Sequence, residues 1–252
     1  AVGNNSLQYN TGSNNTAIGH LSLQGQESND NTGSNNTAIG TSSLAINTTG
    51  YENIAVGSSS LASNTTGANN VAIGNDSLVN NESGTQNVAI GTYSLASNII
   101  GGQNTAIGYQ ALQTNTATGN TAVGRLALQA NTTGTQNVAV GSESLEVNTV
   151  GINNTAIGYQ ALQKNTATGN TAVGRLALQA NTTGTNNCAL GNLALYNNTS
   201  GVNNIAVGAS ALANNTSGAR NIAIGWEALV KNDSGVENVA VGSESLEANI
   251  IG

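Results

Sequence analysis

The feature that most constrains the fold is a short motif, Ala followed by Ile, Val or Leu and then Gly, that recurs along the whole chain. Fifteen copies run from Ala1-Val2-Gly3 to Ala240-Val241-Gly242, and most successive motif glycines are 17 residues apart. Three spacings are 16 residues, and one, from Gly19 to Gly40, is 21. A fixed short period is typical of a solenoid, in which each repeat contacts only its neighbours. The sequence therefore predicts a single repetitive β-solenoid over residues 1–252. Because the chain starts and ends inside repeats, we interpret it as a segment of a longer fibre.

Several positions of the repeat hardly vary when each motif Gly is counted as position 0. Position −2 is Ala in all fifteen copies, position −1 is always Ile, Val or Leu, and position +4 is always Leu. Position −4 is Asn wherever it can be read, and position +7 is Asn in every copy except Gln26. Position −3 alternates between Thr, Val and Ile, with one Cys188.

These positions predict the secondary structure of one coil. The β-branched residues at −3 to −1 favour a short strand, and we expect a second short strand at +3 and +4. The stretch that follows, for example Asn64-Thr65-Thr66-Gly67, is typical of a turn, because Asn and Gly enter positive-φ conformations most easily. A Gly in every coil and the absence of a 3.6-residue period argue against helix. The coil is predicted to consist of two strands and two turns.

Stacked coils would place identical side chains above one another in Leu, Ala, Ile/Val and Asn ladders, and ladders of Asn amides satisfy buried polar groups. Side chains at −1 and −2 of a strand point to opposite faces, and both positions are strictly apolar. One face would lie inside the coil and the other against a neighbouring chain. This pattern predicts a homo-oligomer, most simply a homotrimer around a shared axis, but leaves open which face is which.

Composition excludes several functional classes. Only 7% of the residues are charged, and the net charge of −7 with five basic residues argues against binding to a nucleic-acid backbone. No apolar run approaches the roughly 20 residues that span a bilayer, so we expect membrane attachment only through domains outside this segment. The single Cys188 excludes an intrachain disulfide.

The recurring Asn-Thr/Val-Ala-Ile/Val-Gly core resembles the repeats in the heads of YadA-like trimeric autotransporter adhesins. The longer unit at residues 105–116 and 155–166 is also similar to repeats of phage tail fibres and bacterial surface proteins. The resemblance covers essentially the whole chain and implies a left-handed, trimeric parallel β-roll with an extracellular location on a cell surface or virion. YadA-like coils are nearer 14 residues, so the turns of this chain are longer.

No catalytic, cofactor or metal site is predicted. His20 is the only histidine and lacks metal-binding partners in the sequence, and Cys188 is expected to be a packed, inert thiol. The acidic residues occupy variable or turn positions and are interpreted as solvated charges. One row at position +1 is a candidate for recognition of a cell-surface receptor or glycan, because aromatic and Arg side chains are common anchors. The simpler interpretation is that its Tyr and Arg side chains stack on one another. The row consists of Tyr109, Arg125, Tyr159, Arg175 and Trp226.

Residues 105–134 and 155–184 differ only at Thr114 and Lys164, and such duplication suits a part whose role is length. The favoured hypothesis is a structural and adhesive fibre segment, non-catalytic, from a bacterial surface adhesin or a phage tail fibre. A self-assembling extracellular filament is the alternative. Ice binding by a Thr ladder is weaker, because position −3 mixes Thr with Val and Ile. A β-helix hydrolase is weakest, because the carboxylates do not cluster.

Overall fold

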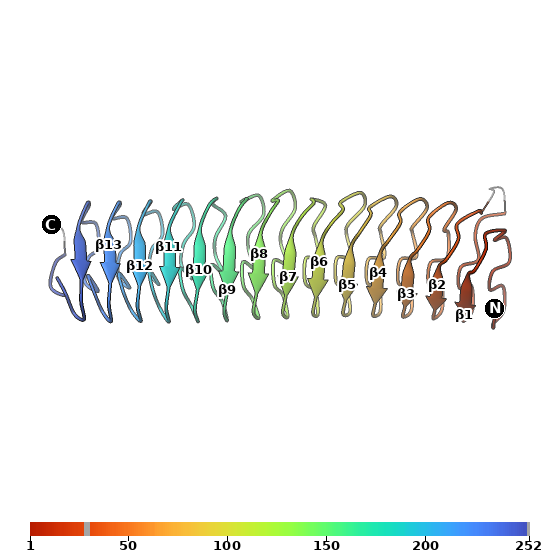
Figure 1. The fold of residues 1–252 in the computed structure, drawn as a ribbon, viewed down its shortest axis with the longest axis horizontal. Coiled ribbons are helices and arrows are strands. Elements are labelled where there is room, and N and C mark those ends of the chain that lie inside the picture. Colours follow the sequence, from red (N-terminus) through yellow and green to blue (C-terminus); the bar gives the residue numbers. More distant parts are fainter. Residues whose placement is uncertain (28–30, 251–252) are drawn as a thin grey trace. The chain divides into compact units, whose positions relative to one another are not determined.

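The chain is an all-β parallel β-solenoid of about 13 turns. The computed structural model describes residues 1–27 and 31–250, which contain fourteen three-residue strands and no helix. The chain divides into two compact units, Ala1–Leu126 and Ala127–Gly252. Within each unit the strands lie side by side and point in the same direction (Figure 1). The prediction of a parallel solenoid is confirmed.

Each unit contains seven strands. The first unit comprises β1 (Thr16–Ile18), β2 (Thr37–Ile39), β3 (Ile54–Val56), β4 (Val71–Ile73), β5 (Val88–Ile90), β6 (Thr105–Ile107) and β7 (Thr121–Val123). The second unit comprises β8 (Val138–Val140), β9 (Thr155–Ile157), β10 (Thr171–Val173), β11 (Cys188–Leu190), β12 (Ile205–Val207), β13 (Ile222–Ile224) and β14 (Val239–Val241).

All fourteen strands cover positions −3 to −1, as predicted, and neighbours within each unit pair in parallel and in register. In β9 and β10, for example, Ala156 lies opposite Ala172. The remaining motif copy, which is the first in the chain, forms a single bridge between Val2 and Ile18 and no strand. Equivalent residues of successive coils therefore stack on one another, which is the arrangement that the repeat implied.

The predicted second strand at +3 and +4 is wrong. The Leu at +4 has a left-handed backbone in every coil, with φ from 46° at Leu23 to 56° at Leu7, whereas a strand requires a strongly negative φ. From Leu23 to Leu229 this side chain is fully buried. The left-handed conformation costs about 1–2 kcal/mol, and burial of a Leu side chain contributes about 1.5–3 kcal/mol. Burial therefore offsets a conformation that local preference would reject.

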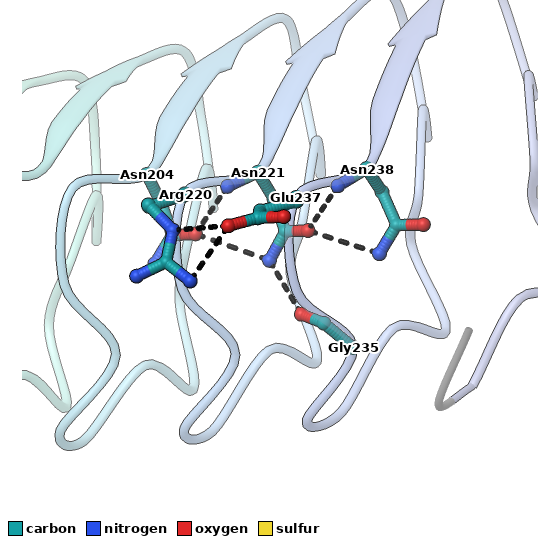
Figure 2. Close-up of polar contacts among 6 residues, drawn as sticks. All are labelled: Asn204, Arg220, Asn221, Gly235, Glu237 and Asn238. Atoms are coloured by element: carbon teal, nitrogen blue, oxygen red, sulfur yellow. Dashed lines mark hydrogen bonds and ion pairs between the residues drawn. The ribbon is translucent and has the colours of Figure 1, made fainter.

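The Asn at −4 forms a buried amide ladder along each unit. The Oδ1 of Asn204 accepts hydrogen bonds from the backbone N of Asn221 at 3.0 Å and from its Nδ2 at 3.2 Å (Figure 2). The same Nδ2 also donates to the carbonyl of Gly235 at 2.7 Å, and Asn238 repeats the two ladder contacts on Asn221. Each amide thus satisfies its own polar atoms and ties two coils together.

The Asn at +7 forms a second buried ladder, as predicted. The Nδ2 of Asn64 donates to the Oδ1 of Asn47 at 2.8 Å and to the carbonyl of Gly67 at 3.0 Å. The turn glycine at +10 is needed for space and not for a positive φ, since a Cβ on Gly50 would lie 2.7 Å from the Nδ2 of Asn64. The expectation that Asn and Gly of this turn adopt positive φ is therefore wrong for Asn64 and Gly67. The left-handed residue of the turn is Asn69.

The motif Gly is required for both conformation and space. Gly208 has a φ of +132°, and a Cβ there would lie 2.6 Å from the carbonyl carbon of Gly225 in the next coil. L-residues rarely adopt this φ, and the backbone of the neighbouring coil occupies the place of a side chain. This explains why Gly occupies position 0 in every copy.

The irregular coils keep a buried Asn at the +7 place but interrupt the amide contacts of that ladder, since the buried Oδ1 atoms of Asn98 and Asn148, which precede two 16-residue coils, have no hydrogen-bond partner among the residues that the structure describes. In the 21-residue coil, Gln26 is position +7 by counting from Gly19. Asn31 is the structural equivalent of the +7 residue, because it forms a parallel bridge with Asn10 and is fully buried. In the 16-residue coil after Gly158, the turn lacks Gly at +10, and the carbonyl of Ala167 accepts the Nδ2 of Asn165 at 2.9 Å instead. Changes in coil length are thus absorbed by the turn.

Candidate functional site

The outward face of the strands forms an apolar strip. Ala at −2 points inward and is at most 3% exposed in every strand, so the side chains at −3 and −1 point outward. Together these two columns provide 28 outward positions (14 strands × 2), none of which is charged. Twenty-one are Ile, Val or Leu, six are Thr and one is Cys. Exposed apolar surface of this continuity commonly marks an interaction site.

The strip is chemically restricted although it is accessible to water. Between Ile18 and Ile224, the exposed side chains at −1 range from 36% at Ile107 to 44% at Ile18. Position +2 provides a comparison, since it is half-buried in most coils. It nevertheless accepts Asp76, Glu143 and many other residue types. Accessibility alone therefore does not explain why position −1 is always aliphatic.

The structure places the candidate recognition row of position +1 on the outside of the coils. Tyr109, Tyr159 and Trp226 are 47%, 45% and 50% exposed, and Arg125 and Arg175 are exposed as well. Tyr109 and Arg125 occupy adjacent coils, because the backbone N of Leu126 donates to the carbonyl of Tyr109 at 3.0 Å.

The second Tyr–Arg pair has the same arrangement, since the backbone N of Leu176 donates to the carbonyl of Tyr159 at 2.9 Å. Trp226 has Ala209 and Ser243 at the equivalent position of its two neighbouring coils. The structure therefore places a Tyr and an Arg of the row on adjacent coils in each unit, and Trp226 has no aromatic or Arg residue at +1 of its neighbouring coils.

Charged side chains pair between adjacent coils near the C-terminal end. Arg220 contacts Glu237, with both its Nε and its Nη2 2.8 Å from the Oε1, and the two side chains are 56% and 66% exposed (Figure 2). Lys231 contacts Glu247 at 2.7 Å. The hydrogen bond that Lys231 donates to Glu247, and then the negative charge of Glu247, raise the pKa of Lys231. Exposed pairs of this kind contribute little to stability, so these positions keep the surface soluble more than they hold the fold.

The two residues considered for other chemistry lie in different settings. His20 is exposed at position +1 of its coil. Cys188 is a free, half-buried thiol in the −3 column of the strip. In that column it lies between Thr171 of β10 and Ile205 of β12. That the thiol is inert remains a prediction.

Within residues 1–27 and 31–250, no three His, Cys, Asp or Glu side chains gather closely enough to hold a metal ion. The same residues enclose no pocket. None of their segments is a helix with the length and apolar character needed to cross a bilayer.

No protein-family model matches the chain, and no curated protein sequence matches it either. The structure itself defines the class of protein, which is a parallel β-solenoid built from tandem repeats.

Proposed function

We propose that the chain is a non-catalytic structural and adhesive fibre segment that associates with further copies of itself through the apolar strip. The observation that supports this proposal is the restriction of position −1. In one coil after another this column is as strictly apolar as the buried Ala column at −2, although its side chains are exposed or half-buried in a single chain. A surface that is covered in the working assembly would be restricted in this way.

A second copy of the chain is the occupant that fits the strip best. The strip is uncharged and devoid of aromatic side chains, so it lacks the groups that commonly recognise charged or sugar ligands. Its rows repeat at the strand spacing of about 4.8 Å. Only a partner with the same spacing can pack its side chains between these rows over many coils. Closed cyclic symmetry is the usual arrangement of identical subunits, and a homotrimer would bury each strip against two neighbours.

The row at +1 would remain available for attachment to a cell-surface receptor or glycan. Its residues follow the motif Gly, where the strand has ended and the turn begins, so they lie outside the strip. Together with the resemblance to YadA-like heads and tail-fibre repeats, this supports an extracellular location on a cell surface or virion. Changing Tyr109, Tyr159 and Trp226 to Ser should abolish attachment to target cells. Unchanged attachment would exclude an adhesive role for the row.

Light scattering at two protein concentrations tests self-association. We expect a stable mass near three chains, and the variant Ile157→Lys with Ile224→Lys should be a monomer. The matched control places the same charges at position +2, as Gln160→Lys with Ser210→Lys, and should remain trimeric. Equal behaviour of both variants would contradict assembly through the strip. A mass that rises with concentration would favour the self-assembling filament.

Cys188 provides an independent measure of how the copies are arranged. If the chains pack in parallel and in register, the thiols of neighbouring copies face the same axis, and a short bifunctional thiol reagent should link them into covalent oligomers. The Cys188→Ser variant should give none. Lack of linking in a protein with a mass of three chains would contradict this arrangement.

Ice binding is a second candidate that the uncharged strip favours, since six of its outward positions are Thr. It requires the strip to remain uncovered. A monomeric wild-type protein that slows ice growth, with loss of this activity in Thr155→Lys, would support ice binding over the fibre proposal.

A further inference from the structure

The buried ladder at +7 coincides with a set of N-glycosylation acceptor sequences. An Asn followed by any residue except Pro and then Ser or Thr can accept a glycan. In eight coils the Asn of this triplet is the ladder residue itself, and all eight are fully buried. They are Asn47, Asn64, Asn81, Asn131, Asn181, Asn198, Asn215 and Asn232.

The acceptor atom of these residues has no room for a substituent. The Nδ2 of Asn64 uses its two hydrogens on the Oδ1 of Asn47 and on the carbonyl of Gly67. A single added carbon on Gly50 would already lie 2.7 Å from this nitrogen. In the second unit, the Nδ2 of Asn181 donates to Asn165 at 2.7 Å and to Gly184 at 2.9 Å. A sugar on Nδ2 would remove one donor and require space that the neighbouring coil occupies.

A second group of acceptor sequences lies on the surface. Asn35 and Asn153 are the left-handed residues that precede the −4 ladder, with φ of 61° and 58°, and both are exposed. Asn14 has the same position, and Asn75 and Asn214 are exposed elsewhere in the coil. A glycan on these residues would extend into solvent and leave both ladders intact.

Glycan transfer forms a bond between Nδ2 and the anomeric carbon of an oligosaccharide and breaks the bond from that carbon to a lipid pyrophosphate. The nitrogen loses one proton, and the lipid pyrophosphate leaves. The enzyme needs a flexible acceptor segment that it can reach. An unfolded chain presents both groups of Asn, whereas a folded chain presents only the exposed group.

We propose that glycosylation and folding exclude each other at the eight buried sequences, so that the native protein accepts N-linked glycans only at the exposed ones. A chain that meets the glycosylating enzyme before it folds would lose its +7 ladder. The solenoid must therefore mature either where this modification is absent or ahead of it. The inference depends on the ladder geometry and is independent of the proposed fibre role.

Expression of the full chain through a glycosylating secretory route, with an oligosaccharyltransferase and its lipid-linked donor, tests the proposal. Site occupancy is measured by mass spectrometry in the protease-resistant and protease-sensitive fractions. We expect glycans on the eight buried Asn only in the sensitive fraction, whereas Asn35 and Asn153 are occupied in both. Occupancy of Asn64 or Asn181 in the resistant fraction would overturn the proposal. So would an unfolded chain that accepts no glycan at any of the eight.

A matched variant removes the acceptor sequences without touching the ladder. Position +9, the third residue of each triplet, is exposed in all eight coils, and Ile100 and Val150 show that this position needs no hydroxyl. The variant is T49A, T66A, S83A, T133A, T183A, S200A, S217A and S234A. It should give a many-fold larger resistant fraction than the wild type from the same secretory route, and the two proteins should fold equally well when no donor is present. Equal yields in the secretory route, with the buried sites of the wild type occupied, would contradict the proposal.

Discussion

The inner and outer faces of a single strand differ in what explains their composition. On β10, Ala172 points inward and is fully buried, whereas Thr171 and Val173 point outward and are half-buried. The inner residue is small because the interior of the coil must also hold a Leu and two Asn side chains. The outer residues have no such limit in one chain, yet the −1 column is equally restricted. Stability of the single chain thus explains the inner face, and the assembly proposed above would explain the outer one.

The largest expected effect comes from placing a charge on each face of the same strand. Ala172→Lys would bury an unpaired ammonium group, which costs several kcal/mol, and we expect the second unit to lose its cooperative unfolding transition. Val173→Lys should change the stability of the monomer by less than about 1 kcal/mol. Circular dichroism during urea unfolding measures the stability of both variants, at a protein concentration low enough to prevent association of the chains. Similar losses of stability in the two variants would contradict the difference between the inner and outer faces of the strand.

Two glycine substitutions test whether the motif Gly is required mainly by the close contact between coils or by its backbone conformation. Gly208→Ala combines backbone strain of about 1–3 kcal/mol with overpacking of about 1–3 kcal/mol, because the backbone of the next coil occupies the space. Gly119 has a positive φ of 72° but nothing within 4 Å of an added Cβ, so Gly119→Ala should cost only about 1–2 kcal/mol. Thermal unfolding should show the larger loss for Gly208→Ala. An equal loss would mean that conformation alone requires the motif glycine.

The ladder and the surface can be compared at two consecutive residues. Asn221→Ala removes the acceptor of two hydrogen bonds from Asn238 and one of the donors to Asn204 and to Gly235 (Figure 2), and we expect a loss on the order of 3 kcal/mol. Arg220→Ala removes an exposed ion pair and should cost less than about 1 kcal/mol. Amide hydrogen exchange in β12 and β13 would reveal the difference. Comparable protection in both variants would show that the ladder is dispensable.

The smallest expected effect is the pH dependence of the Lys231–Glu247 pair. The folded-state pKa of Lys231 is raised by the hydrogen bond that its Nζ donates to Glu247 and by the negative charge of Glu247. The pair therefore stabilises the fold below the unfolded pKa of Lys, about 10.4, and this contribution disappears as the pH rises through the folded value. Wild type should melt slightly above Lys231→Gln at neutral pH, and the two should converge at high pH. A constant difference would mean that the lysine acts through packing of its stem.

Sequence reasoning succeeded where a residue type has one structural use. The Asn ladders, the buried Leu and the strand at −3 to −1 all followed from the repeat. In stacked identical coils, few other arrangements give the Asn amides hydrogen-bond partners and bury the Leu side chains. It failed at the Leu of position +4, where the expected strand requires an extended backbone and burial imposes a left-handed one. It also missed Asn31 as the buried Asn of the 21-residue coil, because the inserted residues before it shift its spacing from the motif Gly. The second Asn-Thr-Gly-Ser-Asn-Asn stretch, at residues 31–36, which copies residues 10–15, was the available signal.

The sequence by itself determined the period, the parallel stacking and the list of residues that must lie in ladders, since each depends only on which positions repeat. It could not determine which apolar face of the strand is the interior, because Ala and Ile are both apolar and alternate on any strand. That choice depends on closure of the whole coil. The left-handed turns at +2 and +4 carry the chain back over the Ala face, and the Ile/Val face is left outside as the strip.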